Sequence, residues 1–294
     1  MIKNNLFYCK NKDTYPPFKN GFYMEEYFLN YINNHSIKTK RKYIPALWTN
    51  FQIENWFQSK KKEMQISLND WLHKNPCEYG YFTIVQYDDG PSLTLPNNTI
   101  IYGACSGDIP LPLIYEDIHN TLLNLKKKAF NEKPILCSFV GNITSNSIVP
   151  NVRKIMFDTL NPNPSFKMIH SGGWSSNVNQ NLQKIFIETT IHSKFSLAPR
   201  GYGRSSFRFF ECFLLGTIPI YIWNDKNWLP FQDTIEYNKL CIVIHISEIN
   251  NLESILKNID ETQYYNMWIY YNKIKYLFEL EGMTNYIIQS LIHE

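Results

Sequence analysis

The chain has 294 residues, of which 44% are hydrophobic and 16% aromatic, enough apolar material for the cores of two domains of ordinary size. This composition excludes an intrinsically disordered chain. Lys and Arg total 29 against 26 Asp and Glu, and the resulting formal charge of +3 is too small and too dispersed to indicate a nucleic-acid partner. It leaves room for an anionic ligand at a single site.

The cysteines and the N-terminal residues bear on the compartment. The six cysteines are scattered and form no CxxC pair, which argues against a zinc site and a redox dithiol. We expect reduced, mostly buried thiols, with disulfides as the alternative for a secreted chain. The first ten residues contain only the short apolar run Leu6–Cys9, far below the roughly 18 to 20 residues of a spanning helix. We therefore expect no signal peptide, no membrane span and a cytoplasmic location.

In the first half, apolar runs bounded by Pro and Gly alternate with helical patterns, which predicts an α/β fold with parallel sheets. The expected elements are a helix over 24–33, strands over 43–48, 81–86 and 99–102, and a helix over 114–128. Three tryptophans of this half, Trp48, Trp56 and Trp71, would stack on sugar rings if they were exposed. Burial in a core is the more common place for tryptophan.

A polar break at 131–134, followed by a buried strand over 135–140, predicts a boundary between domains 1–132 and 133–294. The second half is expected to continue with a helix over 152–160, a strand over 166–170, a helix over 179–190, and strands over 195–198 and 218–223 with a helix between them. The last stretch, 261–293, is compatible with a helix that packs back on the first domain.

The most informative segment, Lys194 to Pro219, reads KFSLAPRGYGRSSFRFFECFLLGTIP. It predicts, in order, a strand over 195–198, a glycine-rich loop over 199–203, a helix cap at Ser205 or Ser206, and a helix that ends at Gly216. Backbone N–H groups and the macrodipole at such a helix start favour a phosphate. Gly201 and Gly203 would let the backbone approach this ligand, because they carry no Cβ.

The polar side chains of this segment predict a ligand with two different ends. At about 100° per residue, Arg204, Arg208 and Glu211 share one face of the helix. Guanidinium groups, including that of Arg200, suit a diphosphate, and a carboxylate suits ribose hydroxyls. A nucleotide diphosphate meets both demands. The alternative is that Arg208 and Glu211 form a surface ion pair and that the glycines serve a turn.

These residues are part of a longer pattern that resembles the signature of the exostosin-like glycosyltransferases. Its centre is PRG at 199–201, Arg204, Ser205 or Ser206, Arg208, Glu211 and GTIPI at 216–220. Similar blocks are YF at 27–28, IPA at 44–46, YDDG at 87–90, DIP at 108–110, FVGN at 139–142 followed by Arg153, and WLPF at 228–231 after Asp225. The resemblance covers nearly the whole chain and is strongest from 139 to 231.

The resemblance implies a GT-B fold, in which two Rossmann-like domains face an interdomain cleft. The C-terminal domain would hold the donor, usually a UDP-sugar, and the N-terminal domain a glycan or glycoconjugate acceptor, with inversion at the transferred sugar. The donor site would also include Gly141, Asn142, Ser205 and Ser206. His170, at the end of a strand before Ser-Gly-Gly, is a further donor-site candidate, although a lone histidine is more often structural.

The charge that builds up on the leaving diphosphate must be neutralised. The chain contains no Asp-x-Asp triplet, the usual metal-holding motif of GT-A enzymes. We therefore expect the arginines and the helix N-terminus to take this role, without metal or cofactor.

Inversion also requires a general base. Asp88 is the first choice, because it matches the acidic position of the family's block, with Tyr87 in place of His; Asp89 and then Asp108 follow. The alternative for Asp88-Asp89-Gly90 is an ordinary turn, since Asp-Gly is a common turn dipeptide. Two other functions compete: a non-catalytic glycan-binding protein with the same fold, and a nucleic-acid binder, which the low net charge disfavours.

Overall fold

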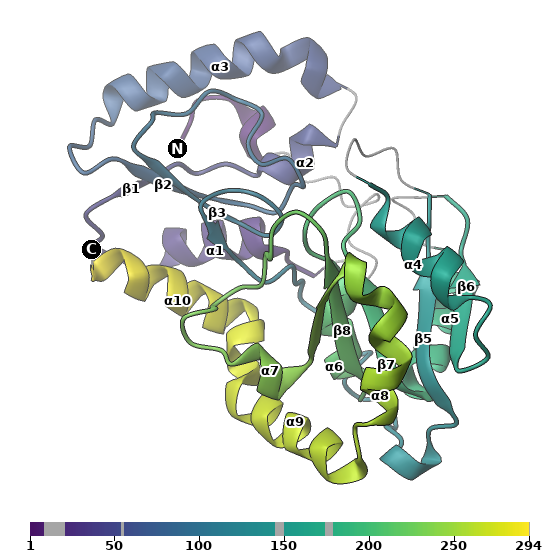
Figure 1. Ribbon diagram of the computed structural model, residues 1–294. Coiled ribbons are helices and arrows are strands. Elements are labelled where there is room, and N and C mark those ends of the chain that lie inside the picture. The colour runs from purple at the N-terminus through teal and green to yellow at the C-terminus, as the bar shows by residue number, and fades with distance from the viewer. Residues whose placement is uncertain (9–20, 54–55, 145–149, 174–178, 294) are drawn as a thin grey trace. The chain divides into compact units, whose positions relative to one another are not determined.

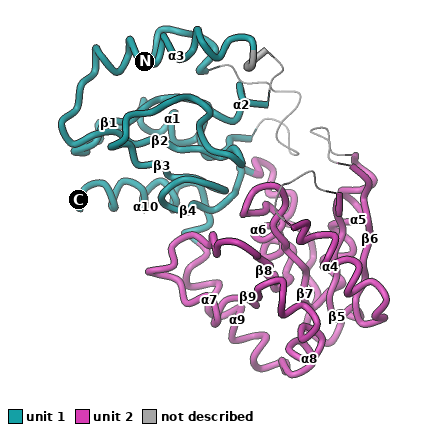
Figure 2. Tube along the Cα trace, turned by 45° about the horizontal axis from the view of Figure 1, so that its top comes forward, with its two compact units in different colours: residues 1–116, 276–294 teal, residues 117–275 magenta. Residues whose placement is uncertain are grey.

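The computed structural model describes residues 1–8, 21–53, 56–144, 150–173 and 179–293 (Figure 1). The chain forms two compact units, residues 1–116 with 276–294 and residues 117–275 (Figure 2). Both are α/β units with parallel sheets, as the sequence predicts. The division differs from a boundary at 132/133 because residues before it pack in the second unit, where the Phe130 ring lies 4.9 Å from that of Tyr264.

The first unit contains a four-stranded parallel sheet in the order β1-β2-β3-β4. Its strands are β1 (Lys42–Tyr43), β2 (Tyr81–Val85), β3 (Thr99–Gly103) and β4 (Ile109–Pro110). Its α-helices are α1 (Met24–Asn34), α2 (Trp48–Gln52), α3 (Trp56–Lys74) and α10 (Leu280–Ile292). Short 3₁₀ helices cover η1 (Asn5–Tyr8) and η4 (Lys275–Phe278).

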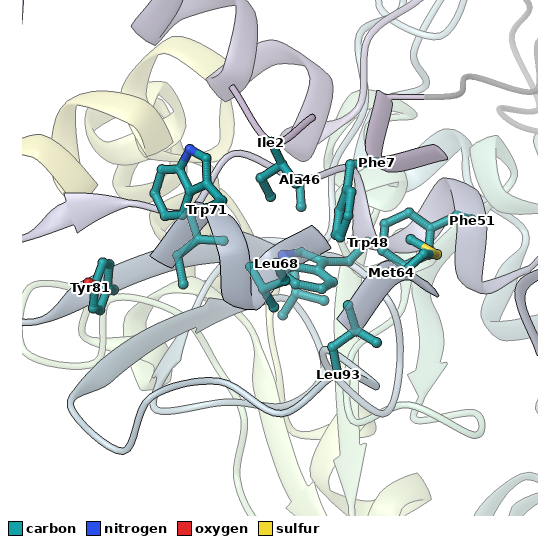
Figure 3. Packing of buried hydrophobic residues seen from close by; sticks show 12 residues of the cluster. Ile2, Phe7, Ala46, Trp48, Phe51, Met64, Leu68, Trp71, Tyr81 and Leu93 are labelled. Carbon is teal, nitrogen blue, oxygen red and sulfur yellow. The ribbon is translucent and has the colours of Figure 1, made fainter. Parts of the chain in front are cut away.

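The central strand β2 is buried on both faces, because successive side chains of a strand point to opposite sides. Tyr81 and Val85 belong to a core cluster with residues of α2 and α3, among them Trp48 and Trp71 (Figure 3). On the other side of the strand, the Phe82 ring lies 6.0 Å from Phe28 of α1. This two-sided burial explains why the strand reads as a continuous apolar run.

Two elements predicted in this part of the chain are wrong. The expected strand over 43–48 ends at Tyr43, and α2 begins at Trp48, whose buried indole Nε1 donates to Thr83 Oγ1 at 2.8 Å. The expected helix over 114–128 is a series of turns, because Asp117 Oδ2 accepts a hydrogen bond from Leu122 N at 2.8 Å and Asn120 has a φ of 50°. The side-chain hydrogen bond of Asp117 and the left-handed backbone of Asn120 both oppose a continuous helix over this stretch.

The second unit contains a five-stranded parallel sheet in the order β6-β5-β7-β8-β9. Its strands are β5 (Ile135–Gly141), β6 (Phe166–His170), β7 (Ser193–Pro199), β8 (Ile218–Trp223) and β9 (Ile242–His245). Its α-helices are α4 (Val152–Leu160), α5 (Gln180–Ile191), α6 (Phe207–Leu214), α7 (Tyr237–Leu240), α8 (Leu252–Lys257) and α9 (Glu261–Ile274). Two 3₁₀ helices are η2 (Phe130–Glu132) and η3 (Ile246–Asn251).

The strand order of this sheet marks the place for a ligand. After β5 the chain goes to one side and forms β6, and it then returns to form β7 on the other side of β5. In parallel α/β sheets, ligands bind beyond the carboxyl ends of the strands at such a switch point. Here these ends are Gly141 of β5 and Pro199 of β7.

At the opposite, amino-terminal edge of the same sheet a lysine is buried. Lys133 is 3% exposed, and its ammonium Nζ donates to Ile191 O at 2.9 Å, Ser193 O at 3.0 Å and Thr217 Oγ1 at 3.2 Å. Burial lowers the pKa of this lysine to about 8. These three hydrogen bonds tie the end of α5 to the starts of β7 and β8.

The five cysteines among the described residues are free thiols, and four of them are buried. In the described part of the chain, no three His, Cys, Asp or Glu side chains are grouped so that they could hold a metal ion. None of the helices described combines the length and the apolar character that crossing a bilayer requires.

Candidate functional site

The segment predicted as strand, loop and helix forms β7, a loop over residues 200–206, and α6. Ser206 is the N-cap residue by its extended backbone, but its side chain makes no capping hydrogen bond. The apolar face of α6 buries Phe209, Phe210 and Phe213. Gly216, with a φ of 77°, follows the helix end. The sequence thus located the strand, the loop and the helix correctly, but Arg204 lies in the loop before α6 and therefore does not share a helix face with Arg208 and Glu211.

Arg200 ties the end of β7 to the end of β8. Its side chain is only 7% exposed, and its Nη1 donates to Asn224 Oδ1 at 3.1 Å and to Asp225 Oδ1. Its Nη2 donates to Tyr202 O at 2.8 Å, which also fixes the following loop. Because several of its donors already have partners in the protein, Arg200 supports the loop over 200–206.

Arg204 shares Asp225 with Arg200. Its Nε donates to Asp225 Oδ2 at 2.9 Å, and its side chain is 32% exposed beside the ring of Trp228, whose centroid lies 5.8 Å away. Burial tends to raise the pKa of Asp225, but the hydrogen bonds from Arg200, the Lys226 backbone and Arg204 outweigh it and lower this pKa to about 2. Asp225 is therefore a carboxylate that holds two cations.

Arg208 lies beneath the carboxyl end of β5. Its guanidinium carbon lies over the rings of Phe139 and Phe186, at 4.9 and 5.2 Å from their centroids, and its Nη2 donates to Val140 O. A Cβ on Gly141 would lie only 2.8 Å from Nη2, so glycine is needed here to admit the arginine. Its buried Nε has no hydrogen-bond partner among the described residues. Burial lowers the pKa of Arg208, and the nearby Glu211 and Cys212 act against this shift.

Arg153, the second residue of α4, spans the switch point. Its Nε donates to Arg200 O at 3.2 Å and its Nη1 to Asn142 O at 3.1 Å, so one guanidinium joins the ends of β7 and β5. A Cβ on Gly201 would lie 2.9 Å from Arg153 Nη2. The guanidinium of Arg153 thus occupies the space beside Gly201, and the approach of a ligand to this backbone stays a prediction.

The remaining donor-site candidates lie around this edge. Asn142 holds its own loop, since its Oδ1 accepts from Thr144 N at 2.9 Å. His170 is exposed and pairs with Gly141 in the sheet, with its Nδ1 3.5 Å from Gly141 O. Ser205 and Glu211 are both partly exposed.

Two residues of the site were missed as candidates by the sequence argument. Asp225 and Arg153 were noted only as parts of the family pattern. Asp225 directly follows a buried strand, Ile218–Trp223, which is a place where site residues of parallel sheets occur. The contacts of Arg153 could not be found from the sequence, because they join segments 47 and 11 residues apart.

The candidates for the general base belong to the first unit. Asp88 and Asp89 lie in a turn after β2, in which Gly90 N donates to Tyr87 O at 3.1 Å and Gly90 has a φ of 79°. Asp108 Oδ2 accepts a hydrogen bond from Ile101 N at 2.8 Å. Asp88, Asp89 and Gly90 therefore form the turn that the sequence offered as the alternative to a catalytic role. Asp108 stabilises the connection after β3.

The tryptophans considered for stacking are not available for it where the structure describes them. Trp48 is 0% and Trp71 is 8% exposed, and both belong to the core of the first unit. The side chain of Trp56 lies outside the described residues.

The arginines are concentrated at this edge. The chain has five arginines, and Arg153, Arg200, Arg204 and Arg208 all lie around the carboxyl ends of β5, β7 and β8. The other 24 basic residues of the chain are lysines. A guanidinium binds phosphate and carboxylate through two parallel hydrogen bonds, which lysine cannot do. Four such groups at one edge of the sheet, two of them paired with Asp225, form a site suited to a polyanion.

Comparisons with known proteins identify the family. The family model named Exostosin GT47 domain matches residues 104–259, more than half of the chain and all of the arginine site. The chain is 32% identical to a "Probable glycosyltransferase" of Arabidopsis thaliana over 91 residues, which are 31% of this chain and 17% of the relative. It is 27% identical to the "Exostosin-1 homolog" of Caenorhabditis elegans over 153 residues, 47% of this chain and 40% of the relative. The matches thus span less than half of either relative. The chain belongs to the exostosin-like glycosyltransferase family.

Proposed function

We propose that this chain transfers a sugar from a nucleotide diphosphate donor, a UDP-sugar, to a hydroxyl of a glycan or glycoconjugate, with inversion and without a metal ion. The observation that carries the proposal is the concentration of four of the five arginines at the switch point of one parallel sheet. The GT-B arrangement of the two units, with the donor on the second and the acceptor on the first, is part of the same proposal.

The arginines would divide the work at the donor diphosphate. Arg204 makes one hydrogen bond through Nε, to Asp225, and its partly exposed guanidinium can turn to a phosphate. Arg153 and Arg208 add positive charge at the ends of β7 and β5. Arg200, which is bound on several sides, would keep the loop in place. Charge on the departing diphosphate would thus be stabilised by groups fixed before the reaction.

The transfer itself needs one base and one displaced group. Asp88, with Asp89 as the runner-up, would take the proton from the acceptor hydroxyl while that oxygen attacks the anomeric carbon of the sugar. The bond between this carbon and the diphosphate oxygen breaks, and the nucleotide diphosphate leaves with both electrons of the bond. Glu211 would accept hydrogen bonds from the ribose hydroxyls. Asp108 is the weakest candidate because its Oδ2 already accepts from Ile101 N.

Donor binding tests the proposal most directly. UDP and a panel of UDP-sugars should raise the melting temperature of the wild-type chain, because a ligand that binds only the folded state stabilises it. Arg204→Ala should remove most of this rise and lower the affinity for UDP by about 10-fold to 100-fold, since charged hydrogen bonds contribute about 1.5–3 kcal/mol.

The fifth arginine provides the control. Arg41 lies in the first unit, where its Nη1 donates to Asn98 O at 2.8 Å, and Arg41→Ala should leave the affinity for UDP unchanged. A panel in which no nucleotide shifts the melting temperature would count against the proposal. Binding of UDP without any sugar transfer would favour a non-catalytic glycan-binding protein.

A further inference from the structure

The connection between β2 and β3 carries Asp88 and has no regular secondary structure. It covers residues 86–98 and begins at the carboxyl end of β2. Connections of this length are commonly among the more mobile parts of a domain. Side chains from three helices of the same unit nevertheless bind its backbone.

The start of the connection is bound by a buried carboxyl group. Glu25 of α1 is 1% exposed, and its Oε1 accepts hydrogen bonds from Gln86 N and Thr49 Oγ1, both at 2.6 Å. Its Oε2 accepts from Thr49 N at 2.9 Å. Burial raises the pKa of Glu25 to about 8, and the hydrogen bonds from Thr49 and Gln86 oppose this shift without cancelling it. One side chain thereby joins the residues after β2 to the start of α2.

The next part of the connection is bound by a buried amide. Gln52, the last residue of α2, is 8% exposed; its Nε2 donates to Gly90 O at 2.9 Å and its Oε1 accepts from Ser92 N at 2.7 Å. The turn that contains Asp88 is therefore held on both sides, at Gln86 by Glu25 and at Gly90 by Gln52.

A third side chain also donates one hydrogen bond to this backbone and accepts one from it, but at an exposed position. Gln65 of α3 donates from Nε2 to Thr94 O at 3.0 Å and accepts at Oε1 from Thr94 N at 2.8 Å. These bonds are exposed to solvent and lie further along the connection. Hydrogen bonds in a buried environment fix one geometry more strictly than exposed ones. The two buried contacts are the ones on either side of Asp88.

We propose that Glu25 and Gln52 are positioning residues, which hold the turn over residues 87–90 so that the Asp88 carboxylate can take the acceptor proton. The inference rests on the proposed function, in which Asp88 is the general base. A base must be oriented closely, because a displacement of about 1 Å can lower the rate about 100-fold. Buried residues that fix the backbone around a reacting group supply such orientation.

The test is a double-mutant cycle on sugar transfer with the full chain. Gln52→Ala should lower kcat about 10-fold to 100-fold and leave the donor KM unchanged. Asp88→Asn should lower kcat at least about 100-fold, as expected for a general base. In the Asp88→Asn background, Gln52→Ala should have no further effect, because Gln52 acts through Asp88. Gln65→Ala, the matched control, should keep kcat within about two-fold.

Gln52→Glu provides a second variant with a pH readout. It keeps an acceptor for Ser92 N but turns an oxygen toward Gly90 O, where the wild type has a donor. A protonated carboxyl can donate this bond again, so the activity of the variant relative to the wild type should rise as the pH falls. A relative activity that does not change with pH would contradict the positioning role.

The possible failures are distinguishable. If Asp88→Asn retains the wild-type kcat, the base in the proposed function is wrong. If Asp88→Asn is inactive but Gln52→Ala is as active as the wild type, the base stands and the positioning role is overturned. Equal losses from Gln52→Ala in both backgrounds would show that Gln52 acts independently of Asp88, which also overturns the inference.

Discussion

The carboxylate of Asp225 offers a quantitative test of the arginine site. Asp225→Asn removes the negative charge to which Arg200 Nη1 and Arg204 Nε donate. A pKa lowered from 3.8 to about 2 corresponds to about 2.5 kcal/mol of stability at neutral pH. Since 27% of the side chain is exposed, solvent screening reduces the expected loss to about 1–2 kcal/mol. Urea unfolding at pH 7 measures this difference between wild type and variant.

The pH dependence of this difference has a definite sign. The pKa of Asp225 is lower in the folded than in the unfolded state, so its stabilising effect is complete above the unfolded value of 3.8 and is lost as the pH falls through about 2. About half of the difference between wild type and Asp225→Asn should remain at pH 3. As a control, Asp158→Asn removes an exposed pair with Lys154 and should change stability by less than about 0.5 kcal/mol. A loss below about 0.5 kcal/mol for Asp225→Asn at pH 7, or one that is equal at pH 7 and pH 3, would refute this reasoning.

Two further substitutions test the packing around the site and the opposite edge of its sheet. Gly141→Ala would place a Cβ 2.8 Å from Arg208 Nη2 and should cost about 1–3 kcal/mol in urea unfolding. Gly173→Ala, where nothing lies within 4 Å, should be close to neutral, and similar losses for both would contradict the steric explanation. Lys133→Ala removes three buried hydrogen bonds and leaves a cavity, so its melting curve should indicate a loss of about 2–4 kcal/mol. The exposed Lys126→Ala should lose less than about 0.5 kcal/mol, and a Lys133→Ala chain as stable as that control would be inconsistent with the buried contacts.

The different partners of Arg200 and Arg208 show what spacing along a segment can and cannot tell about side-chain contacts. The sequence placed Arg204, Arg208 and Glu211 on one face and expected the arginines to converge on a phosphate. In the structure, Arg200 binds Asn224 and Asp225 after β8, whereas Arg208 binds Val140 at the end of β5. Side-chain direction along α6 follows from its period, but the partners come from other strands. The roles of these arginines therefore depend on contacts between segments distant in the sequence.

The sequence by itself determined the α/β class, most strands and helices of the second unit, and the strand, loop and helix around Arg204, because these follow from hydrophobic period, glycines and capping residues within short windows. It also carried the family pattern. Only the tertiary structure decided that Gly141 and Gly201 make room for Arg208 and Arg153, that Asp225 holds two arginines, and that the C-terminal segment joins the first unit. Each of these depends on residues brought together by packing, and packing between distant segments is not encoded in any local period.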